Sequence, residues 1–136
     1  MRWLPLVALL VLAACAADRS RPLSLVRHPL YQAVGGPPGW TLAVGREEIV
    51  LRLAPEAGAG PGGAAMTWRY PSPRAGLEGG VKRWEAGAGT RTIAVEARRS
   101  ACANGAVRFE DEVRIRLGGR ELTGCGGRIR PGRRRR

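Results

Sequence analysis

The sequence predicts an all-β protein: a small antiparallel β-barrel or sandwich with one disulfide, preceded by a cleaved lipoprotein signal peptide and a flexible tether. Two patterns predict the β class. Apolar and polar residues alternate with period two in several short segments, as in strands that turn one face to a core. Turn signals rich in Gly and Pro separate these segments at intervals of about 8 to 12 residues. Since no segment is long enough for an amphipathic helix, we expect strands only.

The first residues have the parts of a lipoprotein signal. A charged start is followed by an aliphatic run from Leu4 to Leu12, and Ala13 and Ala14 precede Cys15. The run is shorter than the about 20 residues of a membrane-spanning helix. Its ending resembles the bacterial lipobox, in which the peptide is cut before the cysteine and the cysteine is acylated. Three acyl chains would anchor the mature protein permanently. The alternative is an ordinary signal peptide cut at a nearby Ala-x-Ala site.

The chain then divides into four parts. We expect a signal peptide over residues 1–14, the lipidated cysteine and tether over 15–30, a periplasmic β-domain over 31–127 and a basic disordered tail over 128–136. About 120 residues remain after cleavage, enough for one domain with one modest core. In enteric bacteria an Asp directly after the cysteine usually signals retention in the inner membrane. Here Asp18 lies three residues further on, which favours the outer membrane.

The remaining cysteines, Cys102 and Cys125, would then lie in an oxidising compartment. An even pair there is typical of a disulfide. Closing a loop of this length contributes about 3 kcal/mol in the chain-entropy model. A metal site is the alternative, but two cysteines and the single, distant His28 make a poor ligand set. We therefore expect no metal and no other cofactor.

The net charge is +12 and the pI is near 11.5, which would suggest nucleic-acid binding in a cytoplasmic protein. Export removes that argument, so we expect no nucleic-acid partner. The basic residues cluster without acids in the ending "GGRIRPGRRRR", where like charges repel and favour an unfolded tail. This tail is either solvated without a specific role or a contact for anionic lipid or lipopolysaccharide. The contact residues would be Arg133, Arg134, Arg135 and Arg136.

The first predicted hairpin covers residues 40–53. Apolar residues alternate with others on each side of the turn "GREE", in which Gly45 tolerates a positive φ. The Gly-, Ala- and Pro-rich residues 55–65 are expected to form a loop, and a short strand follows in "MTWRY", ended by Pro71 and Pro73. Residues 81–102 predict a further strand pair, whose clearer member, 92–98, places Ile93, Val95 and Ala97 on one face.

The last hairpin is the best defined. Gly118 and Gly119 suit a two-residue type I′ turn. Pairing Leu117 with Arg120 then opposes Ile115 to Leu122 and Arg116 to Glu121, so an apolar pair and an ion pair agree on the register. The same register places Cys125 opposite Glu112 on the polar face. Either a bulge at Gly124 turns the cysteine inward, or the disulfide lies outside the core.

Two segments resemble a family of small, largely uncharacterised proteobacterial lipoproteins. "YQAVGGPPGWTLAV" is similar to their Gly-Asn-Glu-Pro-Phe-Trp motif, and "CANGAVRFEDEVRIRLGGRELTGCGG" to their Cys-x-Asp-Gly-Met-Ser ending with a final Gly-Cys. The resemblance implies a Cys102–Cys125 disulfide and a small β-barrel akin to META-domain lipoproteins and membrane-bound inhibitors of c-type lysozyme. Asn104 replaces the family's Asp, which would weaken a binding site there. The matching positions are Gly35, Pro38, Trp40, Cys102, Gly105, Val113, Leu122, Gly124 and Cys125.

The sequence contains few candidate catalytic residues. His28 lies in the tether, a poor place to hold catalytic geometry. Glu110 and Glu112 could act as paired carboxylates, but both should face solvent as part of a charged rim. Tryptophans could line a sugar or lipid groove. Trp40 is better explained by core packing, whereas Trp68 is undecided between the two roles.

These observations predict a non-catalytic lipoprotein of the bacterial outer membrane. Its acylated Cys15 would enter the bilayer, and its periplasmic β-domain would bind an envelope protein, peptidoglycan or lipopolysaccharide, with the motif residues Gly35, Pro38, Trp40, Asn104 and Gly105, together with Trp68, as candidate contacts. Two alternatives belong to other classes: an inhibitor of lysozyme or another hydrolase, although no Ser-Gly loop is present, and an envelope enzyme of unknown type.

Overall fold

The computed structural model describes residues 26–37, 39–55 and 63–130. Within these residues all regular structure is β, and the strands form one antiparallel sheet in the order β4-β3-β2-β1-β9-β8-β7-β6-β5. The predicted all-β class is therefore confirmed, as is the single disulfide, between Cys102 and Cys125. The strands are β1 (Tyr31–Gly35), β2 (Trp40–Val44), β3 (Glu48–Leu53), β4 (Met66–Pro71), β5 (Arg74–Glu78), β6 (Val81–Ala88), β7 (Arg91–Asn104), β8 (Val107–Leu117) and β9 (Arg120–Arg130).

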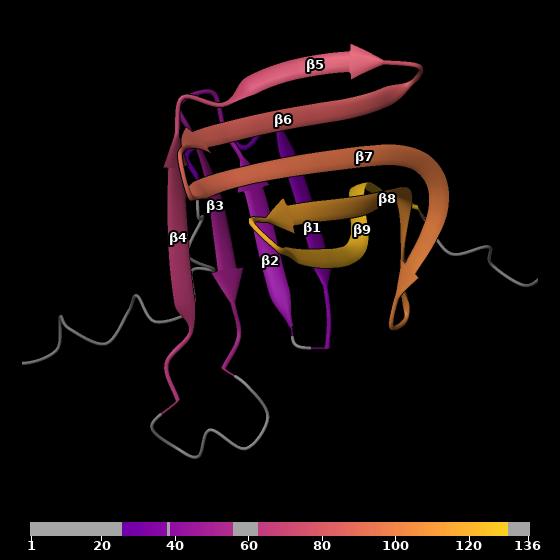
Figure 1. Ribbon diagram of the computed structural model, residues 1–136. Coiled ribbons are helices and arrows are strands. Elements are labelled where there is room, and N and C mark those ends of the chain that lie inside the picture. The colour runs from indigo at the N-terminus through magenta and orange to yellow at the C-terminus, as the bar shows by residue number, and fades with distance from the viewer. Residues whose placement is uncertain (1–25, 38, 56–62, 131–136) are drawn as a thin grey trace, which may run out of the picture.

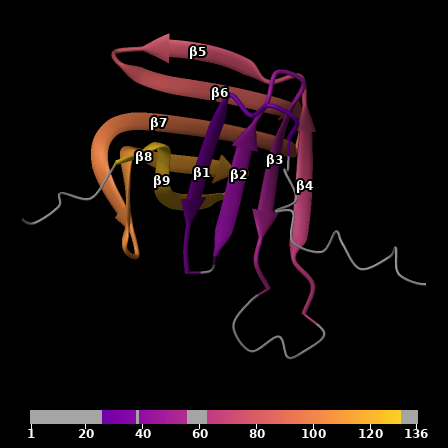
Figure 2. The same ribbon diagram turned by 180° about the vertical axis from the view of Figure 1, so that it is seen from behind.

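The sheet curls on itself into a half-barrel. Figures 1 and 2 show strands β1 to β4 crossing strands β5 to β9 at a steep angle, so that the two parts of the sheet face each other. The tip of the β6–β7 hairpin comes to lie beside β4, and β4 contacts β6 there without forming a ladder with it. This unpaired approach is a seam that a closed barrel would not have.

The main core lies between the two facing parts of the sheet. Alternation explains its composition, because every second residue of a strand points to the same side. Trp40, Leu42, Ile49 and Leu51 come from one part, and Ile93, Val95, Val113, Ile115 and Leu122 come from the other. Trp68 and Trp84 pack partly buried against this core.

Both predicted hairpins are present. The first pairs Trp40 with Leu53 and Val44 with Ile49, and the second has the expected register, with Ile115 opposite Leu122. The turn type of the second hairpin was predicted wrongly. Gly118 has a φ of 58°, but Gly119 does not have a positive φ, which is the φ pattern of a type II′ turn rather than type I′.

The disulfide lies on the outer face of the sheet. Cys125 pairs with Glu112 as expected. It is only 3% exposed, but it does not belong to the main core. It is covered because the far end of β7 bends across and brings Cys102 to it, with the two Cα atoms 5.4 Å apart. Of the two alternatives, the disulfide outside the core is correct; the register irregularity of β9 lies beyond Gly126, not at Gly124.

Two strands were missed, and two segment boundaries differ. β1 is short and contains few large apolar residues, and β5 is exposed at every position, so neither has a strong period-two pattern. The last residues of the expected tether pack on the sheet, where Val26 contacts Ala43 and Val50 and the Leu30 amide donates to the Val44 carbonyl over 2.8 Å. β9 continues to Arg130, three residues past the expected domain end. In the described part of the chain no helix is long and apolar enough to cross a membrane.

Candidate functional site

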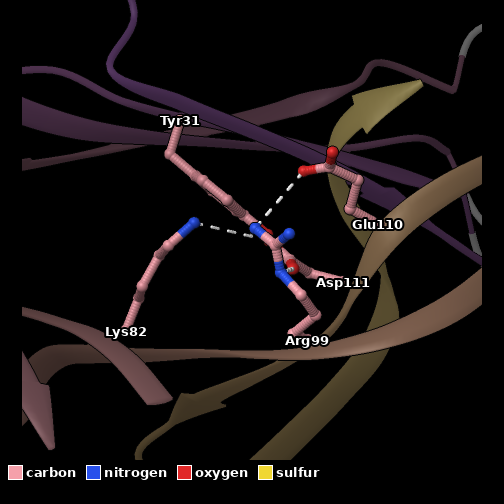
Figure 3. Close-up of polar contacts among 5 residues, drawn as sticks. All are labelled: Tyr31, Lys82, Arg99, Glu110 and Asp111. Atoms are coloured by element: carbon pink, nitrogen blue, oxygen red, sulfur yellow. Dashed lines mark hydrogen bonds and ion pairs between the residues drawn. The ribbon is translucent and has the colours of Figure 1, made fainter. Parts of the chain in front are cut away.

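A buried carboxylate joins the two parts of the half-barrel. Asp111 on β8 is only 1% exposed and is the one buried charged residue in the described ranges. The Tyr31 hydroxyl donates a hydrogen bond to its Oδ2 over 2.9 Å, Lys82 Nζ lies 3.8 Å from the same oxygen, and Arg99 Nε lies 3.8 Å from Oδ1. Arg99 also pairs with Glu110 over 3.6 Å. Figure 3 shows these five residues, which we call the Asp111 cluster.

Two β-bulges shape the backbone around this cluster. Opposite Glu110, β7 and β9 each carry one residue more than regular pairing allows. On β9 the irregularity includes Gly127, whose φ of 81° is typical of glycine in such a bulge. A Cβ there would lie 2.8 Å from Asp111 Oδ2, and a Cβ on Gly126 would lie 2.7 Å from the Tyr31 hydroxyl. The two glycines therefore leave the room that the buried hydrogen bond needs.

The Tyr31 ring is held on several sides. Its centroid lies 4.7 Å from that of Trp84, and Lys82 Nζ lies 5.6 Å from it. Burial, followed by the hydrogen bond to Asp111, raises the pKa of Tyr31 well above its usual value, so the phenol remains a donor. In this cluster each carboxylate faces a cation and the buried hydroxyl has its acceptor, an arrangement suited to fixing the fold.

A hollow, which we call the disulfide hollow, lies on the outer face of the sheet beside Cys102 and Cys125. It has a volume of about 550 Å³ and is lined by Gly35, Asn104 and residues of both charge signs. The structure thus brings two of the motif residues together next to the disulfide. The charged lining residues are Glu96, Arg98, Glu112 and Arg114.

Two other motif residues, Trp40 and Gly105, support the fold rather than line a hollow. Trp40 is 4% exposed, and Gly35 lies so close to its indole that a side chain there would collide with the ring. Gly105 forms the β7–β8 turn with a φ of 61°. Trp40 therefore packs in the core, as its alternation predicts. Cys15, Pro38 and Arg133 to Arg136 lie outside the described residues.

Another hollow, larger than the disulfide hollow, follows the seam of the half-barrel. This seam groove has a volume of about 1140 Å³, slightly above the about 300–1,000 Å³ that small-molecule sites occupy. Trp68 and Tyr70 on β4 form one wall, and Ala86 and Ala88 on β6 form part of the other, with Leu117 of β8 also in the lining. Trp68 is thus the one candidate contact from the sequence that lines this groove.

The charged residues of the seam groove, among those that the structure describes, are all basic. They are Arg69, Arg74 and Arg91. Arg69 is held by Glu48 at 2.6 Å, and Arg74 has a long, exposed contact with Glu85 at 3.9 Å. Arg91 has no acidic partner among the described residues. Within the described ranges the groove therefore has one arginine without an acidic partner, Arg91, and one weakly paired arginine, Arg74.

Tyr70 contributes a polar group to the same groove. Tyr70 is only 7% exposed and packs against the core, but its hydroxyl forms no hydrogen bond with the described residues. Tyr70 is one of the residues that line the groove, so its polar end belongs to the same hollow as Arg91. Burial raises its pKa while the nearby Arg91 lowers it, so the hydroxyl is a neutral donor close to Arg91.

Metal and catalytic groups are sparse in the described ranges. They contain no group of three or more His, Cys, Asp or Glu that could hold a metal ion. His28 is exposed in the segment before β1, Glu112 is exposed on β8, and Glu110 is partly covered and paired with Arg99. The expected charged rim thus holds for Glu112, whereas Glu110 is only partly exposed and forms an ion pair.

Comparison with known proteins adds no assignment: the chain matches no family model, and no curated protein or solved structure is significantly similar to it. The resemblance of its motifs to a lipoprotein family stays a prediction.

Sequence reasoning missed Asp111 and Arg91. The signal for Asp111 was present, because the alternation of Val113, Ile115 and Leu117 continues backward to Asp111 in the same phase. A carboxylate in an apolar phase predicts a buried polar group. Nothing in the sequence around Arg91 distinguishes it from the other exposed arginines, since its place depends on how the sheet curls.

Proposed function

We propose that this chain is a non-catalytic lipoprotein of the bacterial outer membrane that acts by binding a component of the envelope. The observation that carries the proposal is the seam groove, which is large, open to solvent and lined by aromatic and aliphatic side chains with unused polar groups. The anchor would be the acylated Cys15, as the lipobox-like ending predicts.

The absence of catalysis is supported by the arrangement of the acids. Asp111 is enclosed, and both of its oxygens face cations or a donor, so it has no free side for a substrate. Glu110 is paired, and His28 lies in the segment before the sheet, remote in sequence from both acids. A general base needs hydrogen-bond reach to a bound substrate, which none of these groups offers at the seam groove.

The anchoring half of the proposal is tested in cells. The full chain is expressed in a Gram-negative bacterium with labelled palmitate, and the envelope is fractionated. We expect label on the protein and recovery with the outer membrane, and Cys15→Ala should lose both. Unlabelled protein in the soluble periplasm would contradict the anchor.

The binding half is tested with the full chain carrying Cys15→Ala, purified with its disulfide formed. This protein is incubated with a whole-envelope extract that contains lipids, proteins and peptidoglycan fragments and is then repurified, alongside a variant that also carries Ala88→Trp. Because Ala88 is an exposed lining residue, tryptophan there fills the groove without disturbing the core. We expect an unmodified compound to copurify with the first protein and not with the second. Equal retention by both, retention by neither, or chemical conversion of the compound would contradict the proposal.

A further inference from the structure

We propose that the seam groove binds a single-chain anionic amphiphile, with its apolar chain along Trp68 and Leu117 and its acidic head on Arg91. This inference rests on the proposed binding function and names the chemical class of the ligand. The neighbouring side chains of the groove determine that class.

The apolar part of the groove suits a chain rather than a polar polymer. The indole of Trp68 is half-buried, and Leu117 and Ala86 belong to the core, so the floor of the groove is continuous with the hydrophobic interior. An acyl chain placed there removes apolar surface from water at both partners, which stabilises the complex in proportion to the area covered. A sugar would leave its hydroxyls facing these groups without partners.

The polar part of the groove favours a negative head. Arg91 and Arg74 line it with no acid among the lining residues, and only Arg74 has a contact, a long one, with an acid outside the groove. A carboxylate or phosphate head would accept charge-assisted hydrogen bonds from a guanidinium, which are stronger than neutral ones. Tyr70 also lines the groove, and its hydroxyl, which has no hydrogen-bond partner among the described residues, offers one further donor.

The other hollows do not share this combination. The disulfide hollow has acids and bases in equal number, and Lys82 and Arg99 of the Asp111 cluster already face carboxylates. Unpaired positive charge next to a continuous apolar floor occurs, in the described ranges, at the seam groove.

The test uses two soluble lipids that differ only in the head. The full chain with Cys15→Ala is titrated, below the micellar concentration, with palmitoyl lysophosphatidic acid and with monopalmitoylglycerol, and binding is followed by calorimetry. We expect one site, with the phosphate-bearing lipid binding at least about tenfold more tightly. Equal affinity for the two lipids would overturn the preference for an anionic head. The groove would still bind an apolar chain, so the proposed function would stand.

Three variants locate the head. Arg91→Ala should lower the affinity for lysophosphatidic acid by about tenfold, to the affinity measured for the neutral lipid. Ala88→Glu should do the same, because Ala88 is the cross-strand partner of Arg91 and a carboxylate there would neutralise it. Arg108→Ala is the matched control: Arg108 is exposed on β8, outside the groove and without an ion pair in the described residues, so affinity should not change. Equal loss in Arg108→Ala would mean that net charge, not the groove, attracts the lipid.

Vesicles of phosphatidylglycerol form the last arm. Binding to vesicles without binding to monomeric lysophosphatidic acid would mean that the basic surface meets a bilayer, and would overturn the inference. If neither soluble lipid binds a protein whose unfolding transition shows that it is folded, the inference also fails. The envelope-extract experiment then decides separately whether the proposed binding function survives.

Discussion

The two sides of the half-barrel differ in whether their polar and charged groups have protein partners. On the closed side, which holds the Asp111 cluster and the disulfide, the buried carboxylate is met by a tyrosine hydroxyl and two cations. At the seam groove, Arg91 and the Tyr70 hydroxyl have no protein partner among the described residues. Both sides are built on the same sheet and border the same core.

This difference separates stability from binding. Satisfied polar groups on the closed side hold β1, β6, β7 and β8 together, because leaving a buried group unpaired costs about 1–3 kcal/mol. Unsatisfied groups at the seam are exposed to water and can exchange it for a ligand. Substitutions on the closed side should therefore lower stability and spare ligand binding, whereas substitutions at the seam should do the reverse.

The largest expected effect is loss of the disulfide. Replacing both Cys102 and Cys125 with Ala removes a link between residues 23 apart, and the chain-entropy model gives a loss of about 3 kcal/mol in the free energy of unfolding. Urea unfolding of this variant and its parent, both with Cys15→Ala, measures the loss. A loss below about 1 kcal/mol would mean that the curl of β7 persists without the bond. Lysophosphatidic acid should still bind the folded fraction with unchanged affinity.

The buried carboxylate comes next. Asp111→Asn keeps the shape but removes the charge that accepts the Tyr31 hydrogen bond, and we expect a loss of about 2 kcal/mol in the free energy of unfolding. The ion pairs to Lys82 and Arg99 add little, because both cations are partly exposed and hydrated. Glu112→Gln, on the next residue but exposed, is the control and should change stability by less than about 0.5 kcal/mol. Equal effects from both would show that Asp111 does not hold the closed side.

The sequence predicts much of the fold and little of the site. Alternation is a local signal, and it was sufficient for the hairpin around Trp40 and for the register around Ile115. The Asp111 cluster joins residues from β1, β6, β7 and β8, and the seam groove depends on the curl that brings β6 beside β4. That curl arises partly from bulges, which shift a register by one residue and leave no periodic pattern. Local patterns therefore could not predict which arginine would lie in a groove.

The turn at the end of the second hairpin offers a smaller effect on the seam side. Gly118 lines the groove with a φ of 58°, while Gly119 has no positive φ, and a Cβ on either would meet nothing within 4 Å. Gly118→Ala should therefore cost about 1 kcal/mol through backbone strain alone, and Gly119→Ala should cost about zero. Thermal unfolding of the two variants measures the difference. Equal costs would contradict the type II′ assignment.

The smallest effect comes from the same substitution made on each side. Tyr31→Phe removes the buried donor to Asp111 and should cost about 1 kcal/mol at pH 8. Tyr70→Phe removes a hydroxyl that has no hydrogen-bond partner among the described residues, and it should cost less than about 0.5 kcal/mol. Urea unfolding at pH 8 compares them. Equal costs would contradict the contrast between the two sides.

The pH dependence of that cost follows from the raised pKa of Tyr31. Its phenol stays protonated in the folded protein, while in the unfolded chain it ionises with an ordinary pKa of about 10. The stability that Tyr31 contributes is therefore complete below about pH 10 and declines above it, by about 1.4 kcal/mol per pH unit once the unfolded phenol is ionised. Phenylalanine does not titrate, so the gap between the parent and Tyr31→Phe should close by about pH 11. The Tyr70 contribution is common to both proteins and cancels. A gap that stays constant to pH 11 would mean that Tyr31 ionises in the folded state, and that Asp111 and burial do not hold its proton.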